Sequence, residues 1–242
     1  MDAFCGCGGD AIAFAKSSRV SLVVAMDTDR EKLRMASNNA RIYDVPPEKI
    51  VFLHADAIEI MAMYQGGKLS VCHKQTVHTH EKDEQDKEAI GTHDTEVCHG
   101  FQIGGTDLLP PSIDSIFLSP PWGGMDYIEV GSNGYDIKKE IKVTTNRSNV
   151  LKPPPSKENA NNHHQKQTID GETLLQYAMA ASTDQNVIYF LPRNVNGISL
   201  GRSALNGGYH GIFEMEQNVI HGKTKTVTAY FGKFYSKLYT ST

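Results

Sequence analysis

The sequence is poor in the features that mark secreted and membrane proteins. Its 242 residues contain only four cysteines, and two of these, Cys5 and Cys7, are crowded into one glycine-rich stretch. This pattern excludes a disulfide framework and favours a reducing compartment. No apolar run is long enough to span a membrane, and no stretch resembles a secretory signal, so we expect no membrane association.

The chain also lacks a strong charge of either sign. Lys and Arg number 24 against 28 Asp and Glu, which gives a net charge of −4. This balance argues against broad, sequence-independent binding along a nucleic-acid backbone. The length suits one domain with a normal core, and we expect residues 1–242 to form a single domain.

A glycine-rich turn lies at the start of the chain. Residues 2–9 read DAFCGCGG, and residues 10–15 (DAIAFA) have the pattern of an opening helix. Glycines allow backbone conformations that other residues avoid and let the backbone approach a ligand closely. Together with Asp2 and Phe4, the glycines Gly6 and Gly8 are therefore candidates for contact with a bound nucleotide.

Two further segments continue this nucleotide-binding pattern. An apolar strand is predicted over 21–26 and ends in Asp27, and a capping box at Thr28–Glu31 predicts the start of a helix. A third strand over 50–53 leads to Asp56. Strand, glycine turn, helix, strand and acid form the nucleotide-binding half of a doubly wound α/β sheet.

Two cofactor classes fit these residues. Gly6, Gly8 and Ala11 followed by Asp27 also satisfy the dinucleotide fingerprint of NAD enzymes. The additional acids and a proline-aromatic turn described next favour S-adenosylmethionine instead. In that interpretation Asp27 binds the ribose, Asp56 lies near the adenine, and Asp2 lies near the methionine ammonium.

The most informative segment is Ser119-Pro120-Pro121-Trp122-Gly123-Gly124, which follows the apolar run 116–118. Two prolines fix the backbone and supply no N–H donors, which leaves carbonyls available to accept hydrogen bonds. An enzyme that methylates an exocyclic amino group of a base needs such carbonyls to bind the amino group and an aromatic side chain to stack on the base. We therefore predict Ser119, Pro120, Pro121 and Trp122 as the catalytic group, with Ser119 also bordering the cofactor.

The carboxyl-terminal part predicts a helix, a strand and a hairpin. Helical spacing covers 172–181, and a fifth strand ends at Pro192, before Arg193 and Asn194. Two apolar-alternating segments, 212–219 and 224–230, surround a His-Gly turn and predict an antiparallel hairpin. The predicted fold is a Rossmann-like, doubly wound methyltransferase sheet, mostly parallel with this hairpin at its carboxyl-terminal end.

Several of these motifs resemble one family. DAFCGxGG, AMDTDxxKLxxAxNNAxxY, SPPWGGxDY, VIYFLPRN and EQNxxxxKxKTxTAYFG are similar to the trimethylguanosine synthase family of RNA cap guanosine-N2 methyltransferases. The resemblance covers roughly 2–60, 114–137 and 171–234, with the motifs in family order. It implies S-adenosylmethionine-dependent conversion of the 7-methylguanosine cap of small nuclear and nucleolar RNAs to the 2,2,7-trimethyl form.

The resemblance also implies a substrate site and a setting. Trp122 stacks on the cationic 7-methylguanine ring, and four further candidates contact the capped RNA: Tyr127, Arg193, Asn194 and Lys223. Lys225 is a weaker candidate for a phosphate. The expected partners are capped RNAs and their proteins, for a monomer located in the nucleus (nucleolus or nuclear bodies) with the cytoplasm as a second location. No metal is expected.

Two segments and the start of the chain depart from the family pattern. Residues 65–111 and 143–168 are polar and read as inserted low-complexity surface loops, the first with Cys and His residues whose spacing matches no common zinc site. The family also carries helices ahead of the position of Met1, so we expect this chain as written to be marginally soluble and to show little or no methyl transfer. Two alternative functions stay open, an amino-methylase of an internal RNA or DNA base and a non-catalytic cap-binding protein.

Overall fold

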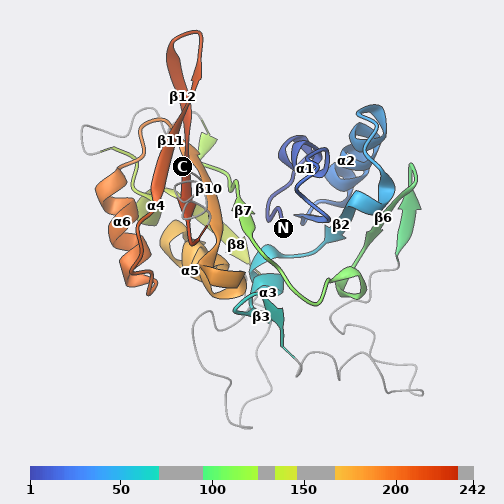
Figure 1. Cartoon of the computed structure of the whole chain (residues 1–242), viewed down its shortest axis with the longest axis horizontal. Helices are drawn as coiled ribbons and strands as arrows, with labels where there is room; N and C mark the ends of the chain where they lie inside the picture. The colour runs from blue at the N-terminus through green and yellow to red at the C-terminus, as the bar shows by residue number, and fades with distance from the viewer. Residues whose placement is uncertain (71–94, 125–133, 146–166, 234–242) are drawn as a thin grey trace, which may run out of the picture.

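A mixed β-sheet runs through the protein, which we describe from a computed structural model for residues 1–70, 95–124, 134–145 and 167–233 (Figure 1). The strand order is β5–β6–β2–β1, then Asp2, then β7–β10–β12–β11. Asp2 forms parallel bridges to Ala25 on one side and Phe117 on the other, and so joins the two halves. The strands of this sheet are β1 (Val23–Asp27), β2 (Ile50–His54), β5 (Glu96–Cys98), β6 (Phe101–Gly104), β7 (Ile116–Leu118), β10 (Val187–Pro192), β11 (Glu214–Ile220) and β12 (Lys223–Phe231).

The central strands are parallel and the edges are antiparallel. β1 pairs with β2, β2 with β6, and β7 with β10, all in parallel register. β12 runs antiparallel to β10, and β11 runs antiparallel to β12. This arrangement confirms the predicted mostly parallel sheet with a carboxyl-terminal antiparallel hairpin.

Helices cover both faces of the sheet. They are α1 (Gly9–Ala15), α2 (Arg30–Ile42), α3 (Ala57–Met61), α4 (Ile137–Glu140), α5 (Gly171–Ala181) and α6 (Gly197–Asn206), with short 3₁₀ turns at Pro47–Lys49, Thr106–Leu108 and Thr183–Gln185. Val23 and Ala25 of β1 pack in one apolar cluster with α1 and α2. Val24 and Met26 pack in the other with α3 and α5. Because successive strand residues point to opposite faces, this division confirms a doubly wound sheet.

Local chemistry explains where the helices begin. The side chain of Asp29 accepts hydrogen bonds from the backbone N–H groups of Glu31 and Lys32, so Asp29 is the N-cap of α2. The predicted capping box placed this role one residue earlier, at Thr28. Asp is at least as good a cap as Thr, and the chain reaches helical geometry only at Arg30.

The expected inserted loop at 65–111 is wrong at both of its ends. The short strands β3 (Tyr64–Gln65) and β4 (Lys68–Leu69) pair with each other, and Gly66 donates a backbone hydrogen bond to Ala180 of α5. At the other end, β6 is a strand of the main sheet. Phe101 and Ile103 of β6 are 1% and 0% exposed, and Phe101 meets Phe52 edge-on. Residues 71–94 lie outside the described part of the chain.

The second expected insertion, 143–168, is also wrong at its ends. β8 (Lys142–Thr145) and β9 (Gln167–Asp170) form an antiparallel pair. Val143 and Ile169 face each other in this pair and are both buried, because they pack into the same apolar cluster as α5. Residues 146–166 between the two strands lie outside the described residues.

Across the described residues, no helix combines the length and apolar character needed to cross a membrane.

Candidate functional site

The predicted site residues gather at one edge of the sheet. Asp27 is the last residue of β1, Asp56 follows β2, Ser119 follows β7 and Arg193 follows β10. These strands are parallel to one another within each half of the sheet, and Asp2 is parallel to both halves. Their carboxyl ends therefore meet at the same edge, which is where ligands bind in open α/β folds.

The glycine turn is tied to the end of β1. Gly6 donates its backbone N–H to Oδ2 of Asp27 at 3.1 Å, and Asp29 donates to Oδ1 at 2.9 Å. Gly6 has a φ of +53°, and a Cβ added there would meet nothing within 4 Å. The backbone at Gly6 is therefore open to a ligand, and Asp27, with about four lone-pair positions, can accept further hydrogen bonds.

Gly8 also has a packing role. Its φ is +89°, and a Cβ there would lie 3.0 Å from Cβ of Ala36 on α2. The glycine lets the start of α1 approach α2 closely. Sequence reasoning placed Gly6 and Gly8 together on the cofactor, whereas the structure separates an open position from a close-packed one.

Asp2 is the most unusual acid of the site. Asp2 is 1% exposed. Its Oδ1 accepts a hydrogen bond from the backbone N–H of Phe4, whereas its Oδ2 has no hydrogen-bond partner among the described residues. Burial raises the pKa of this carboxyl to about 7. A buried carboxylate oxygen without a partner is costly, so it calls for a donor or a cation from a ligand.

Asp56 has a structural role as a helix cap. It is buried, and its Oδ1 accepts the backbone N–H of Ile58 at 2.9 Å as the N-cap of α3. The backbone N–H of the neighbouring Ala55 bonds to the carbonyl of Asp27, which brings the loops after β1 and β2 together. Asp56 therefore lies at the expected edge, with one carboxylate oxygen already used by the helix.

Trp122 is anchored to β10. Its Nε1–H donates to the carbonyl of Phe190 at 3.2 Å, and the two rings lie 5.4 Å apart at 36°. The residue is half-buried, while Pro121, Gly123 and Gly124 beside it are exposed and Pro120 is buried. The indole is thus fixed in orientation and is neither a free surface ring nor fully enclosed in the core.

Tyr135 is a residue that sequence reasoning missed. Its hydroxyl donates to the carbonyl of Trp122 at 3.1 Å, so one of the carbonyls of the turn accepts a hydrogen bond from another part of the chain. The backbone of Tyr135 also bonds to Asn194 and Asn196 in the loop after β10. Tyr135 therefore joins the loops that follow β7 and β10. Its only signal in the sequence is an aromatic residue before an Asp cap.

The remaining substrate candidates are spread along this edge. Arg193 is exposed, and Asn194 is half-buried with its carbonyl accepting the backbone N–H of Tyr135 at 2.7 Å. Lys223 is exposed at the first position of β12, beyond the end of β10. Tyr127 lies outside the described residues.

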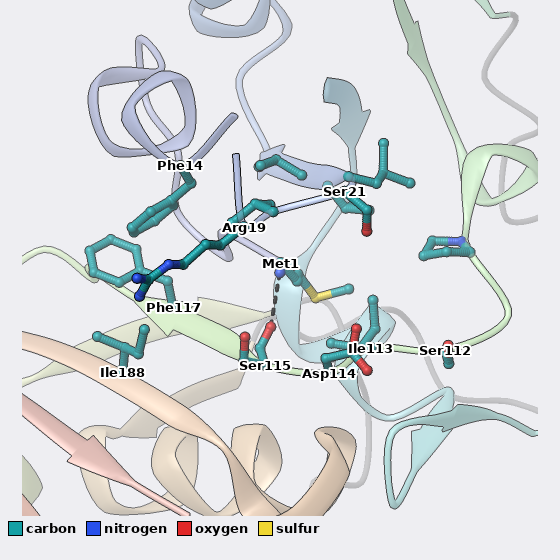
Figure 2. Close-up of a pocket in the computed structure, with 15 residues that line it drawn as sticks. Met1, Phe14, Arg19, Ser21, Ser112, Ile113, Asp114, Ser115, Phe117 and Ile188 are labelled. Carbon is teal, nitrogen blue, oxygen red and sulfur yellow. Dashed lines mark hydrogen bonds between the residues drawn. The ribbon is translucent and has the colours of Figure 1, made fainter. Parts of the chain in front are cut away.

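A half-open pocket lies at the opposite edge of the sheet. It has a volume of about 480 Å³ and is lined by residues that precede β7, such as Asp114 and Ser115, and by the start of β1. Figure 2 shows Met1 in this pocket, where its nitrogen donates to the carbonyl of Ser115 at 2.9 Å, with Phe14, Arg19 and Phe117 to the left of Met1. Because this is the amino edge of the parallel strands, the pocket is distinct from the candidate site.

These residues fit a nucleoside cofactor with a cationic amino-acid tail. Oδ2 of Asp2, which has no partner among the described residues, suits an ammonium group. Asp27 suits ribose hydroxyls, and the open Gly6 allows close approach. Within the described part of the chain, no group of three or more His, Cys, Asp or Glu side chains is arranged to hold a metal ion. Most of the Cys and His residues weighed as a zinc site fall outside that part.

Comparison with known proteins agrees with the geometry. A family model described as "RNA cap guanine-N2 methyltransferase" matches residues 1–234. The trimethylguanosine synthase of Schizosaccharomyces pombe (strain 972 / ATCC 24843) is 35% identical over 68 residues. That stretch is 28% of this chain and 27% of the relative, so the match spans about a quarter of the curated protein.

Proposed function

Because the chain belongs to the family of RNA cap guanine-N2 methyltransferases, we propose that it methylates N2 of the guanine in a 7-methylguanosine RNA cap. The observation that carries this proposal is the anchored Trp122 beside Ser119 at the carboxyl edge of the sheet. A fixed aromatic ring next to polar acceptors can hold a planar base and its exocyclic amino group at once.

S-adenosylmethionine, when bound, supplies an electrophilic methyl group. We assign Asp27 to the ribose hydroxyls, Asp2 to the methionine ammonium, and Asp56 and Phe4 to the surroundings of the cofactor. The hydrogen bond from Gly6 to Asp27 keeps the carboxylate aimed at the glycine turn. The ligand's ammonium would satisfy the buried oxygen of Asp2 that has no partner among the described residues.

The protein's part in the reaction is mainly positioning. The guanine 2-amino group is a poor nucleophile because its lone pair is delocalised into the ring. The Ser119 hydroxyl and the carbonyls of Ser119 and Pro120 would accept hydrogen bonds from this group and turn its lone pair toward the methyl group. Once the nitrogen is methylated it becomes acidic and loses its proton, so no strong base is required.

Trp122 would select the cap. A 7-methylguanine ring carries a fixed positive charge, and stacking on an indole adds a cation–π attraction of about 1–2 kcal/mol to dispersion. The bond from Nε1 to Phe190 and the bond from Tyr135 to the Trp122 carbonyl fix both the ring and its backbone. We further propose small nuclear and nucleolar RNAs as the capped substrates, with the 2,2,7-trimethyl cap as product and a nuclear location for a monomeric enzyme.

Trp122→Ala tests this assignment. The variant should weaken binding of a 7-methylguanosine cap dinucleotide at least tenfold and binding of the unmethylated dinucleotide much less, since only the former rewards stacking with cation–π attraction. Trp122 is the one tryptophan of the chain, so titrating the parent protein with the cap should quench the indole fluorescence directly. Trp122→Phe serves as control because it keeps an aromatic face. Equal loss for both dinucleotides, or an unquenched indole, would show that Trp122 only packs against Phe190.

A further inference from the structure

The hairpin formed by β11 and β12 extends beyond the sheet at the carboxyl edge. The last pair between β10 and β12 is Pro192 with Thr226, whereas β12 begins at Lys223. At about 3.3 Å per residue, the tip projects about 10 Å past the end of β10. Figure 1 shows this tip standing free of the rest of the molecule, at the end of the sheet opposite β3.

The projecting part is basic and contains no acid. Residues 218–226 read NVIHGKTKT, with two lysines and one histidine in a chain whose net charge is −4. Lys223 and Lys225 are exposed, and none of the described carboxylates lies within ion-pair distance of either. The nearest acid on β11, Glu216, pairs with Thr228 further back along the strand and is bonded to Tyr230.

The hairpin is a rigid support for these charges. His221 and Gly222 have φ values of +49° and +71°, as the two-residue turn of a tight hairpin requires. The Asn218 side chain donates to the hydroxyls of Thr226 and Thr228 at 3.0 and 2.9 Å, which ties the two strands together. Lys223 and Lys225 flank Thr224 on β12. The register shifts between Asn218 and Val219, so Lys225 lies at a β-bulge, and both exposed lysines belong to the last turn of the hairpin before its tip.

Arg193 and the hairpin lysines lie at different distances along the strand direction from the position of Trp122. The indole is bonded to Phe190, which pairs with Thr228 of β12. Arg193 comes three residues after Phe190, about 10 Å along the strand direction, and Lys223 lies about 16 Å from Thr228. A base held at Trp122 would place its own phosphates near Arg193, whereas Lys225 and Lys223 are further away.

We propose that the tip of the β11–β12 hairpin binds the phosphates of the single-stranded RNA that directly follows the cap. This inference rests on the proposed function, because it takes Trp122 as the position of the capped base. Ile220 is 55% exposed and pairs directly with Lys223, so it offers apolar contact to sugars and bases beside that lysine. The protein thereby holds a short RNA segment rather than a long backbone, in keeping with its overall negative charge.

The test compares three RNAs: a 7-methylguanosine cap dinucleotide, a capped 12-nucleotide single strand, and the same strand without a cap. Binding of the strands labelled at the 3′ end is measured by fluorescence anisotropy over a range of salt. The double variant Lys223→Ala/Lys225→Ala is compared with Lys16→Ala/Lys68→Ala. The control removes the same charge from two exposed lysines toward the amino edge of the sheet.

The hairpin variant should bind both 12-nucleotide strands about 10- to 25-fold more weakly at 0.1 M salt, because each lost single-strand phosphate contact removes about 0.7 from the salt slope of log K. That slope should fall by about 1.4 in magnitude. The dinucleotide should lose much less, and the control should match the parent protein. Unchanged binding of the strands, or an equal loss for the dinucleotide, would overturn the inference. Strand binding that depends on the hairpin without any preference for the 7-methyl cap would instead contradict the proposed function.

Discussion

Asp2 links the architecture of the sheet to the chemistry of the site. It is the residue through which the two halves of the sheet are joined, and its backbone N–H bonds to the carbonyl of Val24 at 2.8 Å. The same position forces its carboxyl group into the interior, where burial raises its pKa to about 7. Without a ligand, this group therefore tends to hold a proton near neutrality.

Binding of S-adenosylmethionine should for this reason depend on pH. Below pH 7 the ammonium must displace the proton from Asp2, so affinity should rise up to tenfold per pH unit between pH 5 and pH 7 and then level off. Isothermal titration calorimetry in two buffers of different ionisation heat measures both the affinity and the proton released. Asp2→Asn should bind more weakly and show a flat profile. A parent protein whose affinity does not change over this range would refute the role of Asp2.

The unliganded protein offers a second readout for the same group. Because the pKa of Asp2 is raised from 3.8 to about 7 by folding, the native state binds more protons than the unfolded state between these values. The protonated carboxyl of Asp2 therefore adds to the free energy of unfolding at low pH. This contribution, up to about 4 kcal/mol, is lost as the pH rises from 3.8 to about 7. In Asp2→Asn, thermal unfolding should lose this dependence.

At the residue level, strand ends were the predictable part of the site. Asp27, Ser119 and Arg193 each follow a short apolar run, and parallel strands bring such positions to one edge. The contacts of Trp122 could not be predicted, since Phe190 and Tyr135 are 68 and 13 residues away along the chain. Nor does the sequence show which acids are already used as caps, as Asp56 is.

At the level of elements, β6 shows how tertiary context overrides composition. Its four residues, FQIG, follow a long polar segment and include Gln102, so the strand was assigned to an inserted loop. Its burial comes from β2, which pairs with it in parallel and places Phe52 against Phe101. The alternation of Phe101 and Ile103 between glycines was the one available signal. Arg30 and Arg34 of α2 also hold this region through Glu96 of β5.

Ile103→Ala therefore separates a sheet strand from a surface loop. Ile103 is fully buried, and removing its side chain should lower the free energy of unfolding by about 2–5 kcal/mol. The neighbouring Val97 on β5 is 72% exposed, and Val97→Ala should change it by less than about 0.5 kcal/mol. Urea unfolding followed by circular dichroism gives both values. Similar small losses of unfolding free energy for the two variants would show that β6 behaves as a surface loop and not as a strand of the sheet.

At the level of the whole molecule, the order of elements is what could be predicted best. β1, β2 and β10 are each followed by a helix, as the doubly wound pattern requires, and the hairpin closes the sheet as β11 and β12. The strand order could not be deduced in detail, since β6 was missed and the first strand is reduced to the bridges of Asp2. The carboxyl edge nevertheless collects the acids, the Ser119–Trp122 turn and the basic hairpin, so one side of the molecule carries the proposed chemistry.

The most direct test of cap N2-methylation is the mass and position of the transferred methyl group. The protein is incubated with S-adenosylmethionine and an RNA bearing a 7-methylguanosine cap, and the released cap nucleoside is analysed by mass spectrometry. We expect 2,7-dimethyl- or 2,2,7-trimethylguanosine at the cap, no transfer to the same RNA without a cap, and at least tenfold less product with Trp122→Ala at cap concentrations well below saturation. Methyl groups found on internal bases or on uncapped RNA, with an unmodified cap, would contradict this expectation.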